Sequence, residues 1–312
     1  MLIPEQYGVV IVGATGWMGR ATIEYFRRVY GDAILERIWA LGSRARTLPL
    51  ANGGKVNVQS LDSPKIPNDL PVLLFHYAFL TKDKVAGRTE HEYVSANMQI
   101  RDGVAALLKH LDVKGFFMPS SGAVYRAIEG GGANDETLYG NMKLEDEGVF
   151  CKLAKARNIP CVIPRVFNTA GPFINKFEHY ALAAFIVDCV KQNHFRINAD
   201  IGVWRSYYDV SDIIELGINL LMSELDGCCI FDTVGAEIVE IGELAQRVVR
   251  LVGDKNTRVT RPYVKSAKFG ESYYVGRPDA IREYERKFHL NPLTLDAQIL
   301  ETAAYIRSEL GA

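Results

Sequence analysis

The first half of the chain alternates short apolar runs with longer amphipathic segments. The apolar runs are rich in β-branched and aromatic residues, which is typical of buried strands. They predict strands at residues 8–12, 34–41, 55–59, 71–76, 114–118 and 159–165. The segments between them predict helices at residues 17–29, 81–110 (with a break near Gly87) and 139–157. This alternation is typical of a doubly wound α/β fold, a parallel sheet with helices on both faces.

The pattern becomes less regular beyond Gly171. Helices are expected at residues 178–192, 211–223 and 240–253, with a short strand at residues 228–232. We therefore expect one domain over residues 1–170 and a smaller α/β lobe mainly over residues 171–312. Parts of residues 195–225 are expected to return to the first domain, so that the two interleave.

Composition narrows the class of protein. The chain has 312 residues, is 48% hydrophobic and carries a formal net charge of -1, so it is globular and has no general attraction for nucleic acid or anionic membranes. No apolar run approaches the ~20 residues of a membrane span. The N-terminus lacks the features of a signal peptide, and we expect a cytoplasmic protein. Five cysteines without a CxxC pair indicate reduced thiols, and six scattered histidines predict no catalytic metal.

A glycine-rich segment, GATGWMG, follows the first predicted strand and opens the first predicted helix. Glycines allow a tight turn and a close approach of backbone to a diphosphate, while the helix start offers free N–H groups. In this context the segment predicts a Rossmann-type dinucleotide site rather than a plain turn. The expected cofactor-binding residues are Gly13, Thr15, Gly16, Trp17, Met18 and Gly19.

The end of the second predicted strand bears on which dinucleotide is bound. An acidic residue there would hold the ribose 2′-OH of NAD, whereas arginine accommodates the 2′-phosphate of NADP. The sequence LGSRAR offers Ser43, Arg44 and Arg46 and no acid, which favours NADP and leaves NAD possible. The alternative is that these arginines are solvated surface charges. Asp62, after the third strand, is either an adenine contact or a turn former.

Tyr139 and Lys143 are four residues apart and therefore share one helix face. A nearby ammonium lowers the pKa of a tyrosine, which makes the pair suited to moving a proton on or off an alcohol oxygen. Ser121 follows the strand at residues 114–118, where side chains reach the ligand crevice of a parallel sheet. Each signal is weak alone, but their order along the chain is specific. The catalytic residues are expected to be Ser121, Tyr139 and Lys143.

At this point the chain resembles the extended short-chain dehydrogenase/reductase family, in its NAD-dependent epimerase/dehydratase branch. The resemblance covers nearly the whole chain and rests on GATGWMG, FHYA, SSGAVY, YGNMK, RVFNTAGP and WRSYYDVSDI. It implies a cofactor-binding first domain, a substrate-binding second lobe and a nucleotide-sugar substrate. It also implies that His76 and Asn97 join Tyr139 and Lys143 at the cofactor, and that Ser121 and Gly122 lie at the substrate.

The resemblance further implies that Asn168 and Arg205 lie near the substrate diphosphate. A planar guanidinium suits a diphosphate, although a surface salt bridge is the alternative for Arg205. Lys268 stands where the family usually has a second phosphate-binding arginine, with Arg261 and Arg277 as rival candidates. Arg126 stands where the family usually has glycine, so it is expected to narrow the loop above the active site, and contact with the substrate is left open.

The resemblance also separates the reactions of the family. Its 4,6-dehydratases carry an acidic pair just after the strand-end serine or threonine, where this chain has Gly122 and Ala123, so 4,6-dehydration is excluded. The expected function is hydride transfer at C4 by a nucleotide-sugar 4-epimerase or 4-ketoreductase. The rivals are a dehydrogenase of a non-nucleotide alcohol or ketone and a non-catalytic NADP sensor. The family commonly forms homodimers through the helices of Asn97 and Tyr139, and we expect a homodimer here.

Overall fold

The computed structural model describes residues 3–51, 53–84, 87–130, 135–191, 194–264 and 272–311. The chain divides into two compact units. The first comprises Met1–Val166 and Ile214–Phe231, and the second comprises Phe167–Ile213 and Asp232–Ala312. Neither unit is a continuous piece of chain.

One large sheet forms the centre of the first unit. Its strand order is β13-β8-β6-β5-β1-β2-β4-β3, with the short β7 pairing with β8. The strands are β1 (Gly8–Val12), β2 (Ile38–Gly42), β3 (Arg46–Pro49), β4 (Lys55–Ser60), β5 (Val72–His76), β6 (Val113–Phe117), β7 (Ser120–Ser121), β8 (Cys161–Val166) and β13 (Cys228–Asp232). The pairs from β8 through β4 are parallel, whereas β3 runs antiparallel to β4. The chain order reverses on either side of β1, and in such sheets ligands bind beside this point at the carboxyl ends of the strands.

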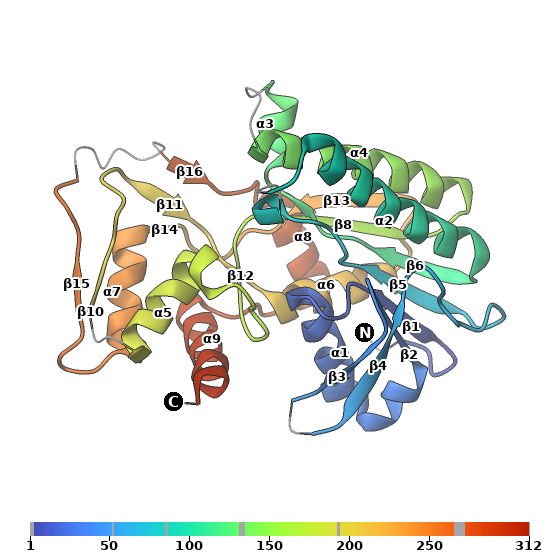
Figure 1. Ribbon diagram of the computed structural model, residues 1–312, viewed down its shortest axis with the longest axis horizontal. Helices are drawn as coiled ribbons and strands as arrows, with labels where there is room; N and C mark the ends of the chain where they lie inside the picture. The colour runs from blue at the N-terminus through green and yellow to red at the C-terminus, as the bar shows by residue number, and fades with distance from the viewer. Residues whose placement is uncertain are drawn as a thin grey trace. The chain divides into compact units, whose positions relative to one another are not determined.

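Helices cover both faces of this sheet, as the sequence predicts (Figure 1). They are α1 (Trp17–Tyr30), α2 (Glu90–His110), α4 (Asp135–Ala156) and α6 (Val210–Leu221), with the short α3 (Val124–Ile128) before α4. Helix α2 begins at a capping box in which Thr89 and Glu92 satisfy each other's backbone N–H groups. The predicted doubly wound α/β fold is confirmed.

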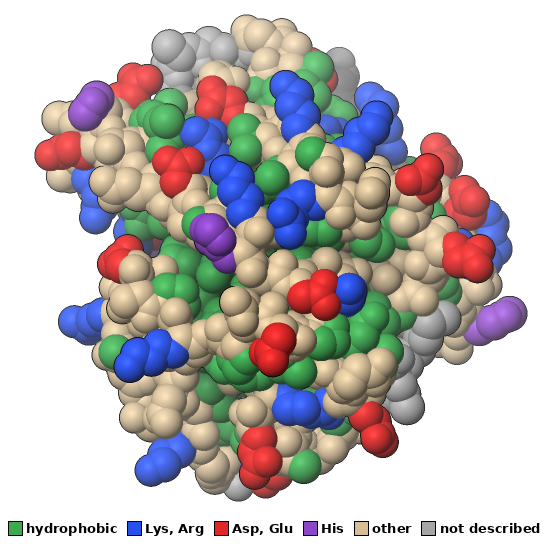
Figure 2. All heavy atoms as spheres, turned by 90° about the vertical axis from the view of Figure 1, so that its right-hand side faces the viewer, with side chains coloured by type: hydrophobic (Ala, Val, Ile, Leu, Met, Phe, Trp, Pro, Cys, Tyr) green, Lys and Arg blue, Asp and Glu red, His purple; other side chains and the backbone are tan. Residues whose placement is uncertain are grey.

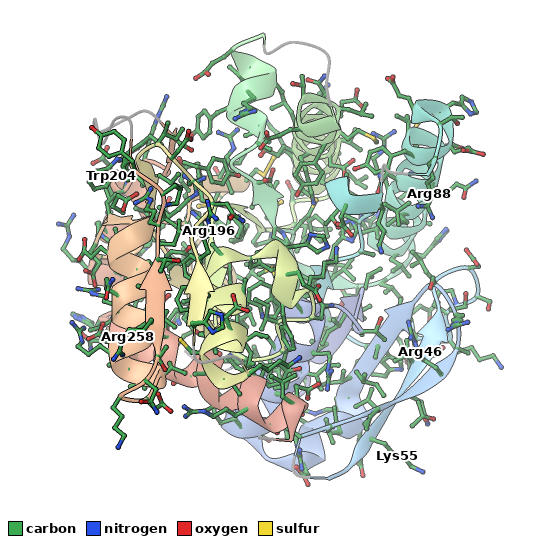
Figure 3. All side chains as sticks on the ribbon, turned by 60° about the vertical axis from the view of Figure 1, so that its left-hand side comes forward. Arg46, Lys55, Arg88, Arg196, Trp204 and Arg258 are labelled. Atoms are coloured by element: carbon green, nitrogen blue, oxygen red, sulfur yellow. A yellow bond between two sulfur atoms is a disulfide. The ribbon has the colours of Figure 1, made fainter. Side chains whose placement is uncertain are left out.

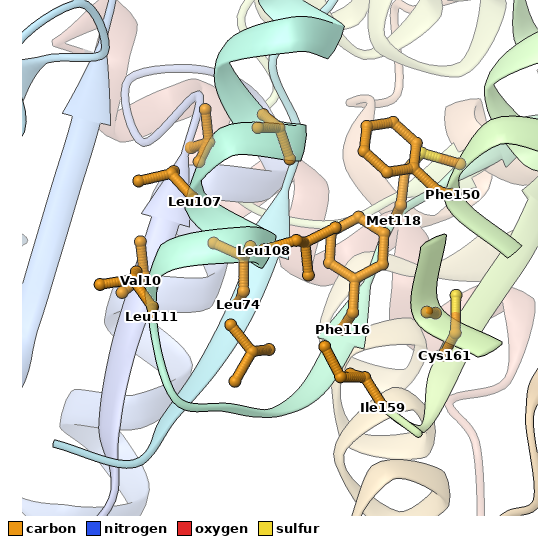
Figure 4. Packing of buried hydrophobic residues seen from close by; sticks show 14 of the residues in the cluster. Val10, Leu74, Leu107, Leu108, Leu111, Phe116, Met118, Phe150, Ile159 and Cys161 are labelled. Carbon is orange, nitrogen blue, oxygen red and sulfur yellow. The ribbon is translucent and has the colours of Figure 1, made fainter. Parts of the chain in front are cut away.

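Alternate residues of the strands supply the two halves of the core. On one face, Val10, Leu74 and Phe116 pack against Leu107 and Leu108 of α2 (Figure 4). On the other face, Phe26 of α1 meets Phe75 at a ring-centroid distance of 5.7 Å. Val104, Leu107 and Leu108 of α2 are buried inside the first unit, so these apolar residues do not form part of a surface for the predicted dimer contact.

One strand prediction in this unit is wrong in detail. Residues 34–41 were expected to form one strand, but Asp32–Arg37 form a 3-10 helix and β2 begins only at Ile38. Gly31, with a φ of +75°, turns the chain directly after α1, and only Ile34 of the turn is deeply buried. The predicted break near Gly87 is confirmed, because residues 81–110 divide into a short 3-10 helix, Lys82–Lys84, and α2, which begins at Glu90.

The second unit contains small sheets and helices. Strand β11 (Val203–Arg205) lies between β14 (Val239–Glu240) and β16 (Ser272–Tyr274), and β9 (Thr169–Ala170) pairs with β12 (Tyr208–Asp209). Strands β10 (His194–Arg196) and β15 (Arg258–Thr260) form a parallel pair that carries Arg196 and Arg258 (Figure 3). The helices are α5 (Ala181–Lys191), α7 (Ile241–Val252), α8 (Asp279–Lys287) and α9 (Leu295–Leu310), and Phe177–His179 form a 3-10 turn. Helices α8 and α9 were not predicted from the sequence.

The surface agrees with the near-zero net charge. Acidic and basic side chains are interspersed on the face shown in Figure 2, without a large area of one sign. Within the described residues, no helix is both long enough and apolar enough to span a bilayer.

The cysteines only partly fit the prediction of reduced thiols. Cys161, Cys189 and Cys229 are free and buried, as expected. Cys151 of α4 and Cys228 of β13 instead form a disulfide, which corrects the prediction for these two residues. They are 77 residues apart, so their proximity arises from the packing of α4 over the sheet and no spacing in the sequence reveals it.

This cross-link should contribute measurably to stability. A disulfide that closes a long loop restricts the unfolded chain and typically contributes about 2–4 kcal/mol. We expect a dithiol reductant to lower the free energy of unfolding by about that amount in urea titrations. The double variant Cys151→Ser/Cys228→Ser is the control and should not respond to the reductant. Five reactive thiols in the unreduced, denatured protein would contradict the cross-link.

His76, the last residue of β5, lies in the core beneath α4. Its ring packs at centroid distances of 6.5 Å from Phe116 and 5.5 Å from Phe150. Only 3% of the residue is exposed, and Nδ1 has no hydrogen-bond partner within the described residues. Burial, assisted by the positive charge of Lys143, lowers the pKa of His76 to about 3. The imidazole is therefore neutral in the folded protein at ordinary pH.

A neutral buried histidine makes stability depend on pH. Below pH 6.5 the unfolded chain takes up a proton at this residue, whereas the folded chain does so only near pH 3, so stability falls as the pH decreases through this range. The loss at pH 4.5 should be on the order of 3 kcal/mol, from two pKa units of about 1.4 kcal/mol each. We expect His76→Phe to lose less stability than the wild type between pH 7 and 4.5 in urea titrations. His110→Phe, at an exposed position, is the control, and identical losses in all three proteins would contradict this assignment.

Candidate active site

The glycine-rich segment connects β1 to α1 through a turn that depends on close backbone contacts. Gly13 has a φ of +84°, and a Cβ at this position would lie 2.6 Å from the backbone nitrogen of Ala78. A Cβ on Gly19 would overlap the carbonyl oxygen of Gly13. Gly16 is the N-cap of α1, and the first turn of this helix carries no acidic residue. The turn is therefore tight, and the start of α1 keeps its partial positive charge uncompensated by an acidic side chain.

The residues after β2 lie next to this turn. Ser43 and Arg44 are exposed, and Arg46 at the start of β3 donates a hydrogen bond of 3.2 Å to the Thr15 hydroxyl (Arg46 is labelled in Figure 3). This contact brings Arg46, which the sequence offers beside Ser43 and Arg44 for the cofactor, to the glycine-rich turn. Asp62, after β4, is exposed and accepts a 3.3 Å hydrogen bond from the hydroxyl of Ser60.

Tyr139 and Lys143 lie one turn apart on α4, as their spacing predicts. The Lys143 ammonium donates a 3.1 Å hydrogen bond to the carbonyl of Pro119, two residues before Ser121. The helix approaches the strand end closely at Gly140, where a Cβ would overlap the backbone of Ala123. The turn of α4 between the tyrosine and the lysine is thus packed against the residues around Ser121.

Ser121 lies in β7 and is 7% exposed. Its hydroxyl oxygen accepts a 3.2 Å hydrogen bond from the backbone N–H of Ala123. Gly122 donates its N–H to the carbonyl of Val166 at 3.0 Å, which continues the pairing of β7 with β8. Ser121 is therefore held by the turn that follows it.

The Lys143 side chain is buried near charged groups of α4, α2 and β8. Burial lowers the pKa of Lys143 to about 8, although Asp146 and Glu147 act in the opposite direction. Arg165 forms two hydrogen bonds with Glu147, at 2.9 and 2.7 Å, and Arg101 lies 3.6 Å from Asp146. Burial also raises the pKa of Asp146 to about 6. Lys143 therefore ionises much closer to neutral pH than an exposed lysine does.

Asn97 is buried in α2 and supports the segment after β5. Its Oδ1 accepts a 2.8 Å hydrogen bond from Leu80 N–H, and its Nδ2 donates to the carbonyls of Leu80 and Tyr93 at 3.4 and 3.2 Å. Tyr93 adds a hydrogen bond of 2.6 Å from its hydroxyl to the same Leu80 carbonyl. In the structure, the Asn97 amide is thus bonded to backbone.

One residue that the sequence analysis did not single out belongs to this group. Phe79 lies directly before Leu80, and its ring contacts both Tyr139 and Lys143. Neither a motif nor a periodic pattern marks it in the sequence. Only the fold brings the segment after β5 against α4.

The predicted substrate residues of the second unit lie around β11 and β16. Asn168 donates from Nδ2 to the carbonyls of Ser206 and Tyr274, at 3.2 Å each. Arg205 donates to the carbonyls of Trp204 and Ser272 at 2.8 Å, and its guanidinium lies 5.9 Å from the Tyr274 ring centroid. Lys268 lies outside the described residues.

Of the two rival arginines, Arg261 has its side chain engaged elsewhere in this unit. Arg261 forms an ion pair of 2.9 Å with Glu240 and donates to the carbonyls of Ala199 and Ile201. The backbone N–H of Arg277 donates to Asp232 at 2.8 Å.

Potential metal ligands converge at a different place in the first unit. In the part of the chain that the structure describes, Cys151, Cys161 and Cys228 are the group of such residues whose ligand atoms lie within 4.8 Å of one another. Two of these sulfur atoms are joined in the disulfide, and none belongs to the predicted site residues.

Known proteins with this fold include several enzymes. A UDP-N-acetylglucosamine 4-epimerase from Methanobrevibacter ruminantium M1 is 17% identical, with 97% of this chain and 98% of that chain covered and a TM-score of 0.71. The UDP-glucose 4-epimerase of Thermotoga maritima is 17% identical, with coverages of 97% and 99% and a TM-score of 0.68. TunA, an NAD dependent NDP-hexosamine 5,6-dehydratase, is 15% identical, with coverages of 96% and 97% and a TM-score of 0.70. No curated protein matches the chain.

A family model gives the more direct assignment. The model of the NAD dependent epimerase/dehydratase family matches residues 9–226, from the first strand of the sheet to the loop before β13. This range contains the glycine-rich turn, Ser121, Tyr139, Lys143 and Arg205 and covers more than half of the chain. The chain therefore belongs to the NAD dependent epimerase/dehydratase family, which consists of enzymes of the extended short-chain dehydrogenase/reductase type.

Proposed function

We propose that this enzyme transfers hydride at C4 of a nucleotide-activated sugar, as a 4-epimerase or a 4-ketoreductase, with Tyr139 as its proton donor and acceptor. The observation that carries the proposal is the arrangement of α4, where Tyr139 and the buried ammonium of Lys143 share one face and Lys143 is bonded to the strand end before Ser121. Two of the similar structures named above are 4-epimerases of nucleotide sugars.

The first unit suits a nicotinamide dinucleotide. The close contacts at Gly13 and Gly19 exclude side chains from these two positions of the turn. Backbone N–H groups at the start of α1 can therefore donate hydrogen bonds to a diphosphate. Thr15, Trp17 and Met18 line the same turn and the first turn of the helix. When bound, the nicotinamide would accept a hydride during oxidation of the sugar and donate one during reduction.

The side chains of the protein transfer the proton of the C4 hydroxyl. The Lys143 ammonium favours the phenolate form of Tyr139, since a nearby positive charge lowers the pKa of a tyrosine. Tyr139 removes a proton from the C4 hydroxyl during oxidation and returns one during reduction. Ser121 donates a hydrogen bond to the same oxygen and orients it.

The residues after Ser121 favour this chemistry over dehydration. A 4,6-elimination needs an acid and a base beside the sugar, and Gly122 and Ala123 can supply neither. The similar structures include dehydratases, among them TunA, so formation of a dehydrated sugar is the result that would contradict the proposal.

Arg205 and Asn168 are our candidates for binding the substrate diphosphate, with Lys268 as a further candidate from the sequence. Arginine can form paired hydrogen bonds with phosphate oxygens, whereas lysine acts as a point charge. A substrate without a diphosphate would leave these groups unused. A thermal-shift screen over UDP, GDP, CDP and dTDP sugars distinguishes the two cases, because only a bound ligand raises the melting temperature.

The role of Tyr139 as the acid/base residue can be tested by removing its hydroxyl. Tyr139→Phe keeps the ring but loses the ionisable hydroxyl, so turnover should fall by at least about 100-fold. Retention of the dinucleotide, followed by its absorbance and fluorescence, should stay near the wild-type level. Tyr263→Phe is the matched control, because Tyr263 is 86% exposed. Full turnover in Tyr139→Phe would refute the mechanism.

Measurements of cofactor retention and turnover on the wild-type protein also distinguish a 4-epimerase from a 4-ketoreductase. Cofactor that copurifies and does not exchange indicates an epimerase, whereas consumption of added NADPH with a 4-keto sugar nucleotide indicates a reductase.

The choice between NADP and NAD can be tested at Arg44. Exposed Ser43 and Arg44, with Arg46 at the Thr15 hydroxyl, favour NADP, although similar structures hold NAD. We expect Arg44→Ala to weaken NADP binding about tenfold and NAD binding little, since a charge-assisted hydrogen bond contributes about 1.5–3 kcal/mol. Titration calorimetry of both cofactors measures this. Lys55→Ala, a change of surface charge at the other end of β4, is the control, and tighter binding of NAD by the wild type would reverse the assignment.

A further inference from the structure

Phe79 lies in the segment that follows β5 and contacts both members of the Tyr139–Lys143 pair. The Lys143 nitrogen is 4.1 Å from the centroid of the Phe79 ring. The Tyr139 ring meets the same ring at 5.6 Å, with an angle of 82° between the planes. The face of one phenyl ring thus contacts the ammonium, and the two aromatic rings meet edge to face.

The backbone around Phe79 is fixed from both sides. Ala78, before it, lies against Gly13. Leu80, after it, is held by Asn97 through its N–H at 2.8 Å and by the Tyr93 hydroxyl through its carbonyl at 2.6 Å. Tyr93 and Asn97 are themselves buried in α2. The Phe79 ring therefore has little freedom to move away from α4.

The ammonium needs such a contact because it has lost most of its water. Lys143 is only 7% exposed, and an ammonium has three hydrogens to donate. The structure describes two direct contacts of this nitrogen, the Pro119 carbonyl and the face of Phe79. The face of an aromatic ring carries the negative part of its quadrupole and attracts a cation, most strongly where water is excluded.

The other charged groups near Lys143 are already engaged. Asp146 and Glu147, on the same helix, favour the ammonium, but Arg101 of α2 lies 3.6 Å from Asp146 and Arg165 of β8 is bonded twice to Glu147. His76 of β5 is neutral, since burial lowers its pKa to about 3. The carboxylates of Asp146 and Glu147 are therefore paired with arginines and do not interact with Lys143 alone.

We propose that Phe79 is a positioning residue. Its ring keeps the Lys143 ammonium charged and holds it on the face of α4 that also carries Tyr139. The role of the pair in turnover rests on the proposed function, but the contact itself does not. Burial lowers the pKa of Lys143 to about 8, so a small change in its surroundings alters its charge near neutral pH. Loss of the ring should then change the charge of the lysine and, through it, the ionisation of the tyrosine.

The test measures the Lys143 pKa directly by NMR in protein labelled with 13C-lysine, with the signal assigned by its loss in Lys143→Met. We expect Phe79→Leu to lower this pKa by about one unit, a tenfold change in the ionisation constant, because leucine fills space without a π face. Phe79→Tyr keeps the face and should leave the pKa close to the wild-type value. Phe288→Leu is the matched control, since Phe288 also lies beside a lysine, Lys287, at 5.3 Å.

A second replacement keeps the test valid if Phe79→Leu does not fold. Incorporation of 3,4,5-trifluorophenylalanine at position 79 keeps the shape of the ring and weakens the negative face, so it should also lower the Lys143 pKa. An unchanged pKa in both the leucine and the fluorinated proteins would overturn the proposal.

Turnover provides a second readout. The basic limb of the pH profile of kcat should move to lower pH by the same amount as the Lys143 pKa, with KM changed little, and a profile that does not move would overturn the role of Phe79 in turnover. The NMR titration needs no substrate, so failure of the proposed reaction and failure of the Phe79 contact can be told apart.

Discussion

The close approach of two backbone turns at the carboxyl ends of β1 and β5 is the constraint on which the site depends. Gly13 permits it through its positive φ and its lack of a Cβ, and Ala78 lies directly against it. The segment that continues from Ala78 carries Phe79 and Leu80, which are anchored to α2 through Asn97 and contact α4 through Lys143. A larger residue at position 13 would therefore disturb the surroundings of the Tyr139–Lys143 pair as well as the turn itself.

Helix α4 combines a structural role with a chemical one. Its inner face carries Phe150 into the core, while Glu147 and Asp146 pair with arginines from β8 and α2. These pairs join α4 to β8 and α2, and removal of one partner of a buried ion pair would leave an uncompensated charge. Tyr139 and Lys143 lie on the same helix.

The sequence predicts what depends on local patterns. The strands from 8–12 to 159–165, the glycine-rich turn and the shared face of Tyr139 and Lys143 follow from periodicity and spacing and are seen in the structure. The start of β2 was placed too early because apolar Ile34 and Leu35 belong to a turn set by Gly31. Phe79 and the Cys151–Cys228 disulfide could not be predicted, because both arise from contacts between segments far apart in the chain.

The division of the chain between the two units has a consequence for synthesis on the ribosome. The chain passes from one unit to the other after Val166, Ile213 and Phe231. Strand β13 lies next to β8 at the edge of the large sheet, yet it is made only after residues 167–213 of the other unit. Until then β8 is an exposed edge, and such edges favour wrong pairing between chains. Translation speed through this stretch therefore bears on how much of the protein reaches its native state.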